Sequence, residues 1–121
     1  MGGAWMRPDI ERRIRQLQGR SIEEMASLIG YDVTTHPFGS GQIEMMVLPA
    51  PHKLIILDPA IYNNPRRREW AIAHMLAHAL TDHRYMPRDP GGKLSPKMLQ
   101  QLAEVDEVAR LLLQVRAREF P

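Results

Sequence analysis

Two histidines spaced four residues apart, His74 and His78, are the pattern in this sequence that most directly indicates chemistry. On a helix, side chains at this spacing lie one turn apart on the same face. Two imidazoles arranged in this way can bind one Zn²⁺, each through a nitrogen at about 2.0–2.1 Å. The alternative is a pair of core or solvent-exposed histidines that hold no metal, and the spacing alone leaves both interpretations open.

A third ligand for such a metal must come from elsewhere in the chain. The last predicted helix carries Glu104 and Glu107, three residues apart on one face. If this helix returns antiparallel to the histidine helix, it brings one of these carboxylates over the pair. Asp82, one turn beyond His78, is a local alternative. Without a metal, each carboxylate is expected on the solvated surface, where most acidic side chains lie.

The elements that must position these residues follow from hydrophobic periodicity and from turn residues. We predict helices over residues 8–17 and 22–29, strands over 31–38, 43–48 and 54–57, a loop over 58–65, a helix over 66–84, a loop over 86–96 and a helix over 96–118. The wholly apolar strand 54–57 is expected at the centre of the sheet, in a hairpin with strand 43–48. The order indicates a single α+β domain over residues 1–121, with two N-terminal helices, a small three-stranded sheet and two long C-terminal helices.

Local patterns refine these elements. Ser21 and Glu24 have the spacing of a capping box, and Gly30 is the expected residue after the helix that they begin. The histidine helix is expected to bury the apolar side formed by Trp70, Ile72, Ala73, Leu76, Ala77 and Leu80. The last helix is expected to bury Leu99, Leu102, Val105, Val108, Ala109, Leu112 and Val115.

Composition excludes several classes of protein. The chain has 121 residues, 16 Lys and Arg against 14 Asp and Glu, and no Cys, so disulfides, thiolate metal sites and a Cys nucleophile are excluded. No apolar run approaches the roughly 18 residues of a membrane span, and the first eight residues do not form a signal peptide, so we expect a cytoplasmic protein that does not bind membranes. A net charge of +2 is too small to indicate nucleic-acid binding, and we expect none despite the arginine run Arg66–Arg68.

Two stretches of the chain resemble the ImmA/IrrE family of metallopeptidases. Residues 68–80 (REWAIAHMLAHAL) are similar to the family's active-site helix, in which an Arg and an aromatic residue precede a small and apolar run and the motif HExxH. Residues 104–113 (EVDEVARLLL) resemble the family's Glu-Ala-Asn/Asp-x-Phe-Ala-x-x-Leu-Leu helix. Residues 21–33 and 53–58 resemble its N-terminal helix with the first strand and its central strand. The resemblance therefore covers roughly residues 21–113, in the family's order.

This resemblance implies a zincin-like fold and a metal site. Zn²⁺ would be held by His74, His78 and Glu104, with a water in the fourth position and Asp106 or Asp82 orienting a ligand histidine. The family implies an intracellular protease that cleaves repressors or regulators, so the expected partner is a protein of that kind.

One position departs from the family motif: Met75 stands where HExxH has Glu. In a zincin that Glu takes a proton from the metal-bound water and delivers it to the leaving amine. A thioether has no proton to exchange, and loss of a general base typically costs about 10²–10⁴ in rate. Because the motif Glu is not a metal ligand, the metal site itself can survive its loss.

Three hypotheses follow from this departure. The chain is a metal-binding pseudopeptidase in which Met75 adds apolar surface beside the metal, or it is a residually active zinc endopeptidase, or it is a metal-free interaction scaffold. Residual activity would need another base, for which the candidates are Asp82, Glu107, His36 and His52. Tyr85 is a further candidate, as an oxyanion donor or simply as an amphipathic residue at a helix end.

Overall fold

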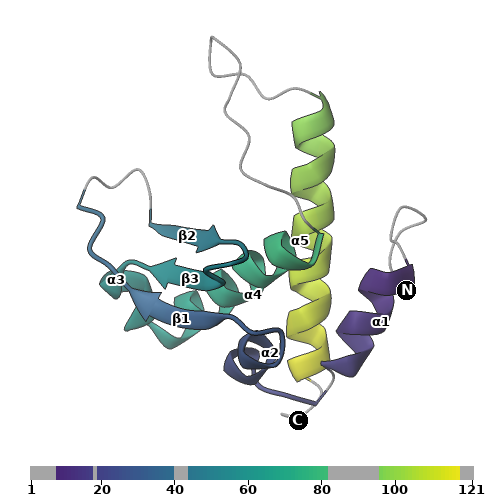
Figure 1. The fold of residues 1–121 in the computed structure, drawn as a ribbon, viewed down its shortest axis with the longest axis horizontal. Coiled ribbons are helices and arrows are strands. Elements are labelled where there is room, and N and C mark those ends of the chain that lie inside the picture. Colours follow the sequence, from purple (N-terminus) through teal and green to yellow (C-terminus); the bar gives the residue numbers. More distant parts are fainter. Residues whose placement is uncertain (1–7, 18, 40–43, 82–95, 118–121) are drawn as a thin grey trace.

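The computed structural model describes residues 8–17, 19–39, 44–81 and 96–117, and this part of the chain is an α+β fold (Figure 1). Its elements are the helices α1 (Pro8–Gln16) and α2 (Ile22–Leu28), the strands β1 (Asp32–Thr35), β2 (Met45–Leu48) and β3 (Leu54–Leu57), and the helices α3 (Pro59–Tyr62), α4 (Pro65–Thr81) and α5 (Pro96–Ala117). The predicted order of helices and strands is confirmed except for α3, which was not predicted. The segment 82–95, which holds Asp82, Tyr85 and the predicted loop 86–96 up to its last residue, lies outside the described residues.

The sheet has the strand order β1-β3-β2, with β3 at its centre as predicted. β3 pairs in parallel with β1 and antiparallel with β2, so the predicted hairpin of the second and third strands is confirmed. In this register Val33, Ile55 and Val47 lie side by side, and Ile55 and Leu57 are fully buried. Because alternate side chains of a strand share a face, these residues form the face that packs on the hydrophobic core.

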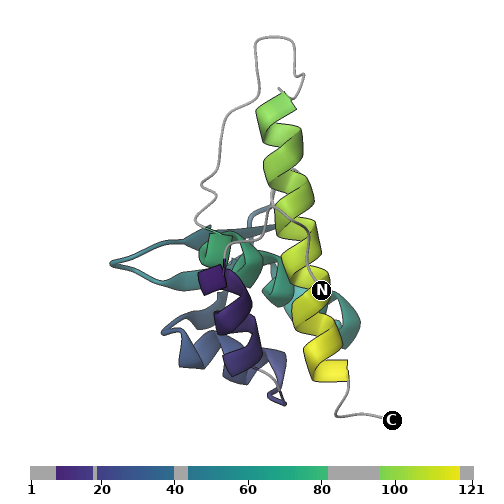
Figure 2. The same cartoon turned by 90° about the vertical axis from the view of Figure 1, so that its right-hand side faces the viewer.

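Helices α4 and α5 form the other half of the core. α4 runs along one face of the sheet, and α5 crosses it steeply (Figures 1 and 2). The buried side of α5 is made of Val105, Val108, Ala109 and Leu112, as its periodicity predicts. The packing of α5 against α4 holds α4 between the sheet and α5, and so positions the two histidines.

The first turns of α5 differ from the prediction. Leu99 and Leu102 were expected in the core, but they are 54% and 42% exposed. This end of α5 projects beyond the sheet and the other described helices (Figures 1 and 2). The apolar spacing continues along the whole helix, but no described element packs against its first turns to bury these leucines. Val115 lies beyond the side chains that the structure describes.

The predicted loop 58–65 was wrong in part, because its first half is the short helix α3. Asp58 caps this helix by accepting a hydrogen bond from the Ala60 amide at 2.9 Å, and Pro59 occupies its first turn. The other carboxylate oxygen of Asp58 accepts from the Phe38 amide at 3.4 Å. The first strand is also shorter than the predicted 31–38. It ends at Thr35, two residues before Pro37, which has no backbone N–H to donate.

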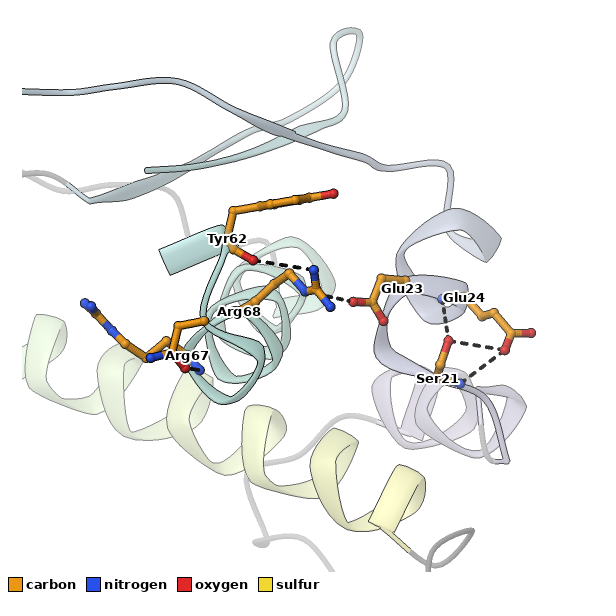
Figure 3. A network of polar contacts seen from close by, with 7 residues as sticks. Ser21, Glu23, Glu24, Tyr62, Arg67 and Arg68 are labelled. Carbon is orange, nitrogen blue, oxygen red and sulfur yellow. Dashed lines mark hydrogen bonds and ion pairs between the residues drawn. The ribbon is translucent and has the colours of Figure 1, made fainter. Parts of the chain in front are cut away.

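The start of α4 is anchored by polar contacts. Asn64 caps it by accepting a hydrogen bond from the Arg67 amide at 3.2 Å. The guanidinium of Arg68 donates to the Tyr62 carbonyl oxygen at 3.4 Å, and its Nε lies 3.4 Å from a carboxylate oxygen of Glu23 in α2 (Figure 3). These contacts join α4 to α2 at the end of α4 that precedes the histidines.

The start of α2 carries the predicted capping box. Ser21 Oγ accepts from the Glu24 amide, and the Glu24 carboxylate accepts in return from the Ser21 amide (Figure 3). Gly30 follows this helix with φ of 85°, a left-handed conformation that glycine adopts without strain. Both predictions made from this stretch are therefore confirmed.

Candidate metal centre

His74 and His78 lie on one face of α4, as their spacing predicts. Their ring centroids are 4.9 Å apart and the rings meet edge to face at 77°. Two imidazoles that share one tetrahedral Zn²⁺ at the usual N–Zn distance have centroids about 5 Å apart. The spacing of the two rings in α4 therefore fits ligation of a single metal ion.

The electrostatics of His74 favour the form that binds metal. Burial lowers the pKa of His74, the charge of His78 lowers it further, and the carboxylate of Asp106 acts in the opposite direction. A lowered pKa keeps the imidazole neutral at pH 7, as ligation requires. The Nδ1 atom of His74 is also buried with no hydrogen-bond partner in the described part of the chain. Such an atom is costly to leave unsatisfied, and a metal ion or a polar neighbour would satisfy the ring.

The facing helix α5 brings the carboxylate of Asp106 close enough to act on His74. Asp106 also forms an ion pair with Arg110 one turn later in the same helix. Carboxylates that orient ligand histidines do so by hydrogen bonding to the ring. Asp106 acts on His74 through its charge, whereas Nδ1 of His74 has no hydrogen-bond partner among the described residues, so the orienting role of Asp106 stays a prediction.

Glu104, the expected third ligand, is partly buried on the same helix, and its carboxylate accepts a hydrogen bond from Gln100 Nε2 at 3.5 Å. At 3.6 residues per turn, Glu104 and Asp106 are about 200° apart around α5, on different flanks of its buried side. Across residues 8–17, 19–39, 44–81 and 96–117, no group of three His, Asp or Glu side chains comes together in a form that could hold a metal. The described residues therefore bring together the two imidazoles without a third ligand, and the metal-binding roles of His74, His78 and Glu104 stay predictions.

Met75, at the position of the motif's general base, is 6% exposed and belongs to the hydrophobic core. It follows His74 directly and therefore lies about 100° around α4 from it. The thioether fills core volume and supplies no group that exchanges protons. A carboxylate at this position would have to be buried or force the helix to adjust.

Trp70 was expected on the buried side of α4, but its side chain is 46% exposed. Its indole stacks on the imidazole of His74, with ring centroids 4.9 Å apart and planes 18° apart. The sequence contained the pattern that identifies this contact, because residues 70, 74 and 78 follow one another at intervals of four. We instead predicted that Trp70 lies in the core, because its side chain is hydrophobic.

Comparisons with protein-family models, curated proteins and solved structures found no match to this chain. The resemblance to the ImmA/IrrE family therefore rests on its motifs and stays a prediction. Among the described helices, none is long and apolar enough to cross a membrane.

The other candidate bases are either outside the described residues or not among the groups whose charge affects His74. His36 is exposed just beyond β1 and packs edge to face on Phe38, with centroids 5.4 Å apart. His52 is exposed in the turn between β2 and β3. Neither is among the groups whose charge affects His74. Glu107 is partly buried on α5, whereas Asp82 and Tyr85 fall in the segment that is not described.

Proposed function

We propose that this protein is a metal-binding homologue of the ImmA/IrrE metallopeptidases that has lost the catalytic base and acts in regulation by binding a protein. The observation that carries the proposal is the pair of imidazoles one turn apart on α4, with ring centroids 4.9 Å apart. The lowered pKa of His74 supports it, because neutral imidazole is the metal-binding form.

In this proposal His74 and His78 hold the metal, and Zn²⁺ suits them when a carboxylate such as Glu104 completes the set. A bound Zn²⁺ supplies Lewis acidity to a peptide carbonyl or to a water. Asp106 would orient His74 in the metal-bound state, although in the metal-free chain its charge opposes the lowering of the His74 pKa. Met75 takes no part in proton transfer, since its side chain is in the core and has no exchangeable proton.

The proposed partner is a protein regulator, such as a repressor. The motifs of residues 68–80 and 104–113 support this choice, because the family that they resemble acts on proteins of this kind. Without a general base, the chain would bind a segment of the partner near the metal and would not cleave it. It would control the regulator by keeping it bound.

Cobalt substitution combined with a hydrolysis assay tests the proposal. Co²⁺ bound by His74 and His78 is expected to give visible absorption bands that are absent from the His78→Ala variant. The metal-loaded chain is expected to cleave an unstructured protein such as casein no faster than the metal-free chain does. Cleavage that depends on metal and on His78 would contradict the loss of activity and favour a residually active peptidase. Failure to bind Co²⁺ and Zn²⁺ would favour a metal-free scaffold.

A further inference from the structure

A small pocket opens beside the first turns of α4, one turn before the histidines. Its volume is about 250 Å³, and it is lined by Glu44, Met45, Ile61, Arg66, Arg67 and Trp70. Pockets for drug-sized ligands usually have about 300–1,000 Å³, so this one suits a single side chain better than a whole small molecule.

The wall of the pocket next to the metal centre is a rigid aromatic ring. Trp70 is held by its stacking on His74, yet 46% of its surface stays exposed. Together with Met45 and Ile61 it gives the pocket an apolar lining. Tryptophan and arginine are the residue types most enriched at the points that dominate binding energy in protein interfaces.

The rim of the pocket carries two arginines that differ in their ion pairs to the described residues. Arg67 pairs with Glu44, with Nη2 and Oε2 3.5 Å apart, so these two charges offset each other. Arg66 is exposed and has no ion pair with any residue that the structure describes. Among the described residues, the pocket therefore presents an apolar cavity beside one arginine that has no ion pair.

These features are continuous with the metal centre. Arg66, Trp70, His74 and His78 follow one another at intervals of four residues and form one stripe along α4. A peptide segment seated at the pocket would extend along this stripe toward the histidines.

We propose that the pocket receives one apolar side chain of the partner protein, and that an adjacent Asp or Glu of the same segment pairs with Arg66. The inference rests on the proposed function for its protein partner, although the pocket itself requires no metal. A single-stranded nucleic acid is the competing class of ligand, because an arginine beside an exposed tryptophan also suits a phosphate and a base. Because Glu44 offsets Arg67, Arg66 is the cation left uncompensated among the described residues that line the pocket. One cation suits a single carboxylate better than a chain of phosphates, and so we favour the peptide.

Two capped peptides that differ in one charge test the proposal, Ac-Gly-Phe-Glu-Gly-NH₂ and Ac-Gly-Phe-Gln-Gly-NH₂. The protein is the full chain with Trp5→Phe, which leaves Trp70 as its single tryptophan. Binding is followed by the NMR shift of the Trp70 indole N–H. We expect the acidic peptide to bind about two- to fivefold more tightly, the range that one exposed ion pair supplies.

Arg66→Gln is expected to remove this preference, while Arg12→Gln, a change of an exposed arginine on α1, is expected to leave it intact. Both arginines are exposed, so neither change should prevent folding. Equal binding of the two peptides, or a preference that survives Arg66→Gln, would overturn the proposal. Tighter binding of an oligothymidylate than of the acidic peptide, at the same salt concentration, would also overturn it.

The same titrations repeated with Zn²⁺ and with a chelator separate this proposal from the proposed function. Peptide discrimination without any zinc binding would uphold the pocket and contradict the metal centre. Zinc binding without peptide discrimination would uphold the metal centre and contradict the proposal for the pocket.

Discussion

The indole of Trp70 lies nearly parallel to the imidazole of His74, with centroids 4.9 Å apart and planes 18° apart. This contact covers one side of a candidate metal ligand with an apolar ring and so contributes to the burial that lowers its pKa. It also joins the candidate metal centre to the pocket at the start of α4. The two sites are therefore neighbouring parts of one surface.

Removal of the indole should raise the pKa of His74. Trp70→Ala uncovers the imidazole, and lower desolvation favours its charged form, so the pKa moves up toward its ordinary value of about 6.5. NMR titration of the His74 Cε1–H in chelator-treated protein measures the change. Arg12→Gln, a change of an exposed residue on α1, serves as the control and should leave the titration unchanged. An unaltered His74 titration in Trp70→Ala would show that the stacking does not bury the ring.

The stability of the metal-free protein should depend on pH through His74. Because the folded-state pKa lies below the unfolded value, the unfolded state binds more protons in that window, and stability falls as pH drops below about 6.5. The stabilising contribution is fully present above that pH. Urea unfolding of the chain and of His74→Gln across this range isolates the effect, since the variant lacks the titrating group. Parallel pH profiles for the two proteins would contradict the assignment.

Restoring the motif glutamate should destabilise the fold. Met75 is 6% exposed, so Met75→Glu buries a carboxyl group without a ready partner and should cost about 2–4 kcal/mol in the free energy of unfolding. Met75→Leu keeps an apolar side chain of similar size and should cost less than about 1.5 kcal/mol. Urea midpoints give both values. Equal stability of Met75→Glu and the parent chain would mean that residue 75 reaches solvent or the metal centre.

The carboxylates of α5 should differ in their effect on metal affinity. If Glu104 is a ligand, Glu104→Gln weakens Zn²⁺ binding, while Glu107→Gln leaves it nearly unchanged. Asp106→Asn should weaken binding about 10- to 100-fold, the usual effect of removing a group that orients a ligand histidine. Competition with a zinc indicator measures all three. A loss confined to Glu107→Gln would transfer the ligand role to that residue.

Substitutions along α5 should separate its buried and projecting parts. Leu112 is fully buried, and Leu112→Ala should cost about 2–5 kcal/mol. Leu99 is 54% exposed, and Leu99→Ala should change stability by about 0.5 kcal/mol or less. Thermal or urea unfolding compares the two variants. A similar large loss from both would mean that the first turns of α5 are covered in solution.

Much of the fold followed from local patterns in the sequence. The capping box of Ser21 and the short apolar strand Leu54–Leu57 gave the start of α2 and the centre of the sheet, because both depend on residues that are close in sequence. The short helix α3 was missed although Asp58 and Pro59 have the types expected at a helix start. A four-residue helix has too little periodicity to be distinguished from a loop.

The remaining differences concern what lies opposite a side chain. Leu99 and Leu102 continue the apolar spacing of α5, and periodicity alone does not reveal where the facing elements end. Likewise, the spacing of His74 and His78 predicted their shared face, but the approach of Asp106 depends on how α5 crosses α4. Contacts between distant segments are set by packing, and a single sequence carries little information about them.

Zinc content of the purified chain, compared with His74→Ala and His78→Ala, tests the central claim most directly. After dialysis against zinc and removal of the excess, elemental analysis should find about one zinc per parent chain and a loss of that zinc in each variant. Thermal unfolding of the three proteins confirms that the variants remain folded. A parent chain that retains no zinc, or folded variants that retain as much as the parent, would contradict a metal centre built on these two histidines.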